Sequence, residues 1–379
     1  MALQRNMPTL SIRFYLTVLS YFLFVYLIPD IASAQSGLEL IHANKQVTQE
    51  IDGELVHQFE GDVHFRQDTL EMYCDDAILY EKKNKLEFKG KVSISDGHRR
   101  IRALKIDYLT KDKIAYCYNR VRIKTINDSM YTDYLKYNFK TDEADAKKNI
   151  YIYNADNEVQ IWGQSGIYNP NEKLNRIWDN ARFIKVDTTS GDTLDITAYQ
   201  LDYFSGDDKR AVAIDSVTIL QGALKAICDS AVYQTETELV SLFFSPFAWY
   251  ENNRLSGKYM EAQFDSLKLK EIIVTEEAKA VSLVDSISKK ENILTGNKIH
   301  FAIEKNKPKL VTATDNATSI YYLQNQDKKD QGCNYATSDT ILVYFAEGKL
   351  DSIAIKGGSE GIYYPDEYKG KKVFENDQQ

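Results

Sequence analysis

The chain repeats one short pattern along most of its length, and this repetition limits its fold more than any other feature. We place the unit starts at Gly61, Gly90, Asn119, Lys148, Asp179, Asp215, Phe244, Thr275, Thr314 and Lys356, at intervals of 29 to 42 residues. A recurring aromatic residue ends an apolar run in nine units: Tyr80, Tyr108, Tyr137, Tyr168, Tyr203, Tyr233, Phe264, Phe301 and Tyr344. Such a period predicts a stack of supersecondary units rather than a domain with one unique active site.

Within each unit apolar and polar residues alternate, as in Asp62-Val63-His64-Phe65 and Lys91-Val92-Ser93-Ile94. A period of two with β-branched and aromatic residues on one face predicts strands buried on one side and wet on the other. No segment after the first 34 residues has a convincing helical stripe. We therefore predict an all-β fold, a repeat β-jelly roll or β-solenoid of two facing antiparallel sheets, in which each unit opens at a turn.

The first 34 residues have the pattern of a secretory signal peptide. Arg5 and Arg13 precede an apolar run from Phe14 to Ile28, and Ala32-Ser33-Ala34 offers a small-residue cleavage site. An uncleaved anchor is the alternative, but the run is short for a transmembrane helix, which needs about 20 apolar residues. We divide the rest into a lead-in over 35–60, regular repeats over 61–235, irregular repeats over 236–368 and a disordered tail over 369–379.

Charge and cysteine content exclude several partners and cofactors. The formal net charge of −8 and the lack of a long cationic run argue against nucleic-acid binding. Bare anionic head groups would also be repelled, unless a local cluster such as His98-Arg99-Arg100-Ile101-Arg102 contacts them. The four cysteines, Cys74, Cys117, Cys228 and Cys333, have no C-x-x-C spacing. We expect buried free thiols, with disulfides as the alternative.

Enzymatic motifs are missing from the sequence. The five histidines have no metal-binding spacing, and Gly163-Gln164-Ser165-Gly166 is one residue short of a nucleophile elbow. We therefore predict no catalytic residues, metal site or cofactor. Asp-Ser/Thr-apolar triplets such as Asp68-Thr69-Leu70 resemble the O-glycosylation tripeptide of exported Bacteroidota proteins; the alternative is that they only open strands.

Several motifs resemble those of the OstA/LptA family of periplasmic lipopolysaccharide-transport proteins. They are Phe59-Glu60-Gly61-Asp62-Val63, Asp76-Ala77-Ile78-Leu79-Tyr80, Phe88-Lys89-Gly90-Lys91-Val92 and Asp229-Ser230-Ala231-Val232-Tyr233, and the resemblance is clearest over 55–235. It implies a V-shaped jelly roll with lipid A acyl chains between the sheets. It also implies that end strands dock transport proteins or further copies by strand addition. This chain has more units than a single family domain.

The resemblance and the apolar faces together predict a non-enzymatic lipid-transfer protein that shields lipopolysaccharide acyl chains and bridges the inner and outer membranes. We expect it in the periplasm, with association with the outer membrane left open. The alternative is a β-solenoid scaffold that binds only proteins. Our candidate lipid-lining residues are Val63, Phe65, Leu70, Met72, Ile78, Tyr80, Leu86, Phe88, Val92, Ile94, Ile106, Tyr108, Leu135 and Tyr137. The same residues could instead fill a dry core, since periodicity does not distinguish a groove from a sealed sandwich.

The two ends of the stack are candidate docking edges, because a terminal strand leaves backbone N–H and C=O groups unpaired. We expect the strands around Val56 to Phe65 and around Ile353 to Ile355 to form these ends.

Overall fold

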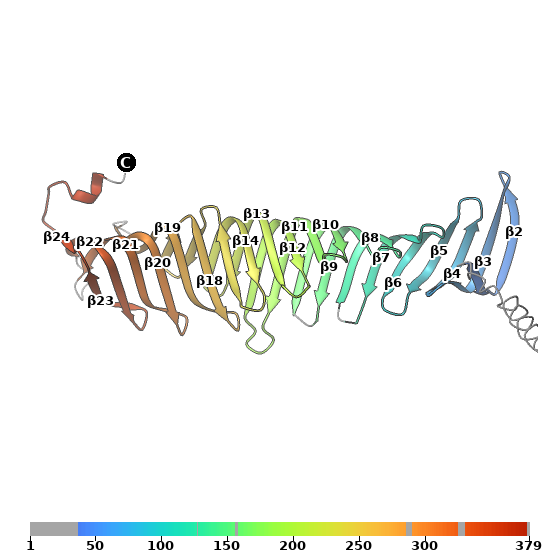
Figure 1. Ribbon diagram of the computed structural model, residues 1–379, viewed down its shortest axis with the longest axis horizontal. Helices are drawn as coiled ribbons and strands as arrows, with labels where there is room; N and C mark the ends of the chain where they lie inside the picture. Colours follow the sequence, from blue (N-terminus) through green and yellow to red (C-terminus); the bar gives the residue numbers. More distant parts are fainter. Residues whose placement is uncertain (1–36, 127, 156–157, 286–289, 325–329, 377–379) are drawn as a thin grey trace, which may run out of the picture.

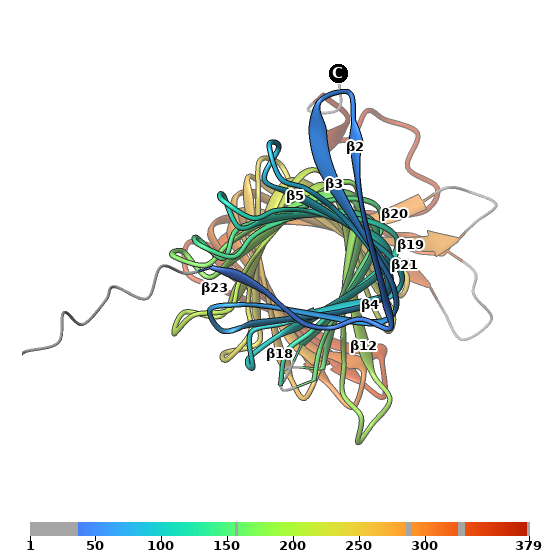
Figure 2. The same ribbon diagram turned by 90° about the vertical axis from the view of Figure 1, so that its right-hand side faces the viewer.

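The computed structural model describes residues 37–126, 128–155, 158–285, 290–324 and 330–376. The predicted signal peptide therefore lies outside the described residues. The described chain forms one long roll of antiparallel strands that follow each other along the long axis (Figure 1). Viewed along this axis, the strands surround a common centre (Figure 2). The predicted all-β repeat of facing antiparallel sheets is confirmed.

The strands of the first half are β1 (Leu38–His42), β2 (Lys45–Ile51), β3 (Glu54–Gln67), β4 (Leu70–Tyr80), β5 (Lys85–Ser95), β6 (Arg100–Leu109), β7 (Ile114–Lys124), β8 (Asp128–Asn138), β9 (Ala144–Asn154), β10 (Val159–Asn169), β11 (Leu174–Val186) and β12 (Thr193–Phe204). The second half has β13 (Arg210–Gln221), β14 (Leu224–Gln234), β15 (Leu239–Phe243), β16 (Phe247–Tyr250), β17 (Asn253–Ser256), β18 (Tyr259–Asp265), β19 (Lys268–Asp285), β20 (Lys290–Glu304), β21 (Lys307–Gln324), β22 (Asp330–Ala346), β23 (Lys349–Lys356) and β24 (Glu360–Tyr364).

From β3 to β14 each strand pairs with the next one in the chain. After β14 each of two layers consists of two short strands in place of one long strand. The short strands β15 and β16 both pair with β14, and β17 and β18 both pair with β19. The long strands β19 to β22 then continue the series. The strand series runs without interruption past residue 235, and the predicted division there stays a prediction.

Eight of the ten predicted unit starts are corners inside strands; Phe244 and Lys356 instead lie at the breaks between β15 and β16 and between β23 and β24. At or next to each start, two consecutive residues have positive φ, for example Gly61 (φ 76°) with Asp62 (φ 49°) and Gly90 (φ 72°) with Lys91 (φ 44°). The strand register shifts at these corners, as between Glu60 and Val63. Left-handed residues in a bulge bend a strand, which explains why Gly, Asn and Asp recur there. We correct the prediction of turns accordingly: each bent strand contributes one segment to each of two facing sheet halves.

The two halves enclose one continuous apolar core that extends from Phe59 to Ile341. Aromatic rings from opposite halves contact each other inside it: Phe65 packs edge-on against Phe59 with ring centroids 5.1 Å apart, and Phe183 lies 6.0 Å from Tyr233. Protein interiors with such contacts are close-packed. Around these rings the roll is therefore filled by its own side chains.

Both ends of the chain differ from the prediction. The strand β3, which contains Val56 to Phe65, is not the end of the stack, because β1 and β2 both pair with it and cover its edge. The lead-in over 35–60 thus includes the terminal layer. At the other end, Val373–Asn376 form a 3₁₀ helix, and Phe374 is buried near Tyr364. The predicted disordered tail is therefore corrected up to Asn376, and residues 377–379 lie outside the described residues.

Candidate lipid-binding seam

The hairpins that join the bent strands form two rows, and the rows meet along one side of the roll. The first row includes the hairpins β3–β4, β5–β6, β7–β8, β9–β10, β11–β12 and β13–β14. The second row includes β4–β5, β6–β7, β8–β9, β10–β11, β12–β13 and β14–β15. We call the line where the two rows meet the seam. The corners lie on the opposite side of the roll, so the seam is the open side of the predicted V.

Polar contacts from one row to the other bridge the seam. They join Gln67 to Tyr108 and Thr110, Asp68 to Lys113, Arg99 to Asp142, Lys185 to Glu238, and Gln221 to the carbonyl oxygen of Leu267. The Tyr108 hydroxyl donates to Oε1 of Gln67 at 2.7 Å, and the Arg99 guanidinium lies 2.9 Å from the Asp142 carboxylate. Partly exposed ion pairs of this kind contribute about 0–1 kcal/mol each. The seam is thus closed by contacts that are individually weak.

Four of the recurring tyrosines line the inner side of the seam. Tyr108, Tyr137, Tyr203 and Tyr233 are buried near the ends of strands that lead into the second row. Burial raises the pKa of Tyr203 to about 12 and raises the pKa of Tyr233 as well. Both hydroxyls are buried without a hydrogen-bond partner in the described part of the chain. In these four units the repeating tyrosine therefore has a structural role, because it fills the seam from within.

A cavity of about 410 Å³ opens at the seam in the middle of the roll, and we call it the seam cavity. First-row residues such as Thr125 and second-row residues such as Ser205 face it from the two sides. Its apolar lining includes Met130, Ile152, Val159, Ile161, Tyr137, Tyr168 and Tyr203. Such a volume lies in the range of small-molecule sites, about 300–1,000 Å³. Here the apolar interior can be reached from outside between the two rows.

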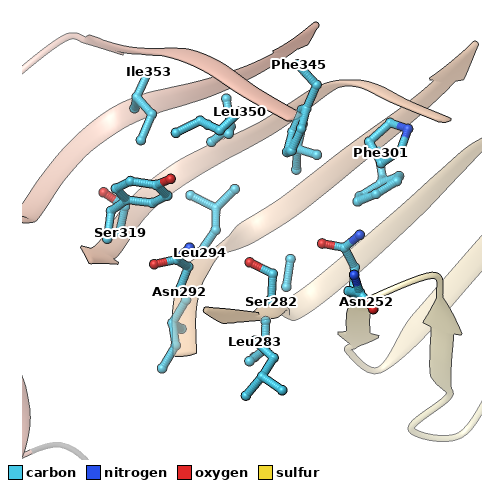
Figure 3. Close-up of a pocket in the computed structure, with 18 of the residues that line it drawn as sticks. Asn252, Ser282, Leu283, Asn292, Leu294, Phe301, Ser319, Phe345, Leu350 and Ile353 are labelled. Atoms are coloured by element: carbon cyan, nitrogen blue, oxygen red, sulfur yellow. The ribbon is translucent and has the colours of Figure 1, made fainter. Parts of the chain in front are cut away.

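A second cavity, of about 250 Å³, lies near the C-terminal end of the core (Figure 3). Leu294, Phe301, Phe345, Leu350 and Ile353 surround it, and Asn252, Ser282 and Asn292 lie at its polar side. We call it the C-terminal cavity. Its residues come from β19 to β23 and from the turn before β17, where the core residues Val343, Phe345 and Ile353 are only partly buried.

Twelve of the fourteen candidate lining residues are buried in the core. They are Val63, Phe65, Leu70, Met72, Leu86, Phe88, Val92, Ile94, Ile106, Tyr108, Leu135 and Tyr137. Of these only Tyr137 lines the seam cavity, so the other eleven fill the packed part of the roll. Whether any of them contacts lipid stays a prediction.

Ile78 and Tyr80 point to the outer face, and their predicted inward position is wrong. The register shifts between Tyr73 and Asp76, so the inward positions of β4 after the corner are Ala77 and Leu79. A shift of one residue moves every following side chain to the other face of a strand. The same holds for the recurring aromatic Tyr344, because its neighbours Val343 and Phe345 pack on the core.

The cavity residues Ile161, Leu294 and Leu350 were missed by the sequence prediction. All three lie in strands with ordinary alternation, which does not show where the two hairpin rows separate. The signal that could have marked the C-terminal cavity is the longer, irregular spacing of the late units.

The described residues contain no group of three or more His, Cys, Asp or Glu side chains placed to hold a metal ion. Across the described ranges no helix is long and apolar enough to cross a membrane. All four cysteines are free and buried, and Cys74 and Cys228 lie at equivalent places opposite Val63 and Val217. Burial raises the pKa of the thiols of Cys74 and Cys228 to about 12.

The terminal layers leave apolar side chains uncovered. At the N-terminal end Leu40, Ile41, Val47 and Ile51 are exposed, and at the C-terminal end Ile362 and Tyr363 are exposed. The end strand β23 contains Ile353 to Ile355, where the sequence placed the C-terminal edge. An edge strand with exposed apolar residues can pair with a strand of another chain.

Residues 35–189 match the model of the family described as OstA-like protein. The match covers β1 to β11, including most of the seam cavity. A search among curated proteins finds no match. Among solved structures, the crystal structure of LptH from Pseudomonas aeruginosa, the LptA homologous periplasmic component of the lipopolysaccharide transport device, is similar at 12% identity. The similarity covers 46% of this chain and 81% of that chain, with a TM-score of 0.19.

Proposed function

We propose that the chain is a non-enzymatic periplasmic carrier of lipopolysaccharide, a function supported by the match of residues 35–189 to the model of the OstA-like protein family. Acyl chains of the lipid enter the roll through the seam and lie against its apolar interior. The observation that supports this best is the seam cavity, where the hairpin rows separate and the otherwise closed core becomes accessible.

The physical need for such a carrier follows from the cost of exposing acyl chains to water. Each buried CH₂ group contributes about 0.8 kcal/mol, so a lipid with several chains does not cross an aqueous compartment unaided. The roll offers apolar side chains in every layer from Phe59 to Ile341. Because the layers are alike, the binding free energy changes little from one to the next, and a lipid can move along the roll without a deep trap.

Lipid entry into the packed layers requires the seam to open. The contacts that bridge it, such as Arg99 with Asp142 and Tyr108 with Gln67, are individually worth about 1 kcal/mol. The tyrosines then turn aside, and acyl chains replace their contacts with the opposite half. The backbone ladder of each half stays intact during this motion, since the seam is crossed by side chains and not by strand pairing in the described layers from β3 to β14.

The exposed end layers support a bridge between the two membranes. The layer β1–β2 at one end and the layer β23–β24 at the other both present an unpaired edge among the described strands. We propose that other lipopolysaccharide-transport proteins, or a further copy of this chain, add a strand at these edges. The apolar interiors of successive molecules then become continuous.

Filling the two cavities tests the carrier function. Ala144 lines the seam cavity and Ala280 the C-terminal cavity, so Ala144→Phe and Ala280→Phe reduce the space for acyl chains. Leu220→Phe, on the exposed outer face, is the control. We expect wild type and the control to be extracted from cells with bound lipopolysaccharide, measured by mass spectrometry, and the doubly filled variant to carry several-fold less.

Absence of lipid from the folded wild-type protein would contradict the proposal. It would favour the alternative of a scaffold that binds only proteins, an interpretation to which the packed layers around Phe65 and Phe88 are also suited.

A further inference from the structure

Four cations lie directly opposite one another on the outer face of two neighbouring strands. Arg100 of β6 is paired in register with Lys124 of β7, and Arg102 is paired with Arg122. Like charges in directly opposed positions destabilise a sheet. None of the four forms an ion pair with a carboxylate in the described part of the chain.

At two other places on the outer face of the roll, an arginine is paired with a carboxylate. Between β3 and β4 the Arg66 guanidinium lies 2.7 Å from Glu71, and between β11 and β12 the Arg182 guanidinium binds Asp195 at 2.6 Å. In contrast to these two pairs, the four cations of β6 and β7 face one another without a carboxylate partner among the described residues. This contrast indicates that the missing anion is supplied from outside the chain.

The cations surround a hollow of about 360 Å³ that also includes Ser95, His98 and Arg99. Nε of Arg122 is buried in this region without a hydrogen-bond partner among the described residues, and its guanidinium lies over the Tyr131 ring at 5.1 Å. Buried donors normally have partners, and a guanidinium fork matches the oxygens of a phosphate. Arg99 is already paired with Asp96 and Asp142, so the free positive charge comes from the other four cations.

The hollow adjoins the seam cavity: His98, Arg99 and Thr125 line both. A basic site thus lies beside an apolar opening of about 410 Å³. A molecule that contacts both must combine an anionic group with an apolar chain. An inorganic anion would use only the hollow, and a neutral lipid only the cavity.

We propose that Arg100, Arg102, Arg122 and Lys124 bind the phosphate group of an acylated, phosphorylated lipid whose chain enters the seam cavity. The inference rests on the proposed function, because it assumes that acyl chains enter at the seam. It adds a recognition site for the lipid head beside the seam cavity, where the lipid enters the roll.

Substitution of the central pair tests the site. Arg102→Gln with Arg122→Gln removes the two facing guanidinium groups, and Arg66→Gln with Arg182→Gln is the control, since it removes two arginines that are matched by carboxylates on the same face. The probes are bisphosphorylated lipid A, the same lipid after dephosphorylation, and inorganic phosphate, with dissociation constants measured by calorimetry at fixed salt.

We expect the central double variant to bind phosphorylated lipid A at least ten-fold more weakly than wild type, with unchanged affinity for the dephosphorylated lipid. The control should bind both lipids like wild type. Because like charges are removed, the melting temperature of the central variant should be equal to or above that of wild type, which excludes misfolding as the cause.

Equal affinities of wild type and the central variant for the phosphorylated lipid would overturn the site and leave the carrier function intact. Failure of wild type to bind either lipid would refute the carrier function itself. If inorganic phosphate binds as tightly as the phosphorylated lipid, the hollow is a site for free phosphate, and the lipid proposal is wrong.

Discussion

Two isoleucines at the same place in the sequence repeat should differ strongly in their contribution to stability. Ile78 and Ile106 both precede a recurring tyrosine by two residues. Ile106 is 0% exposed and belongs to the core, whereas Ile78 is half-buried on the outer face. Replacing a buried isoleucine by alanine costs about 2–5 kcal/mol, while the outward one loses about 1 kcal/mol, mainly strand propensity. We expect Ile106→Ala to destabilise the fold by at least twice as much as Ile78→Ala.

Urea unfolding followed by circular dichroism measures this difference, provided that both variants keep the wild-type slope with denaturant. The two substitutions remove the same atoms, so each is the control for the other. Equal losses, or a larger loss for Ile78→Ala, would refute the register shift at the corner of β4 and with it the assignment of the inner face.

Three further outcomes follow from the structure. Gly90→Ala should lower the free energy of unfolding by about 1–2 kcal/mol, because a residue with a left-handed backbone gains a Cβ. Adding Asp75→Ala should remove only the close contact between this Cβ and the Asp75 carboxylate, so that the loss is recovered in part. Full recovery in the double variant would mean that there is no backbone strain. The native cysteines should not react with a thiol reagent at pH 8, because burial raises the pKa of Cys74 to about 12; rapid labelling before unfolding would disprove their burial. A hydrogen bond from His64 lowers the pKa of Glu71, so its stabilising effect is present above about pH 4.5 and is lost as the pH falls through the lowered value. Glu71→Gln should reduce the fall in melting temperature as the pH is lowered below about 4.5. An equal fall in wild type and the variant would contradict this.

The repeat itself could be predicted from sequence because it results from local backbone needs. Gly61, Gly90 and Asn119 are at corners that require positive φ, and such residues recur wherever a strand must bend. Alternation of apolar and polar residues then identifies the strands between the corners. The strand class, the inward position of most candidate residues and the burial of the cysteines all follow from these two signals.

Which side chains face the core, and where the cavities lie, was harder to predict from the sequence. The corner shifts the alternation in both strands, so that the next inward residue after Cys74 is Ala77 and the next after Ala103 is Ile106. Ile106 therefore faces the core and Ile78 does not, although both precede a tyrosine by two residues. The seam joins residues far apart in the sequence, such as Arg99 and Asp142, and no local pattern shows that two hairpin rows meet. The hollow beside Arg102 depends on the pairing of β6 with β7, which places like charges in opposite positions.

Photo-crosslinking at the seam tests the central claim most directly. A photoreactive amino acid at Ile161, buried beside the seam cavity, should capture lipopolysaccharide in cells, and the same group at Tyr199, which is 51% exposed on the outer face, should not. Capture at Ile161 alone would place acyl chains inside the roll. No lipid adduct at Ile161, or equal capture at the two positions, would contradict the account.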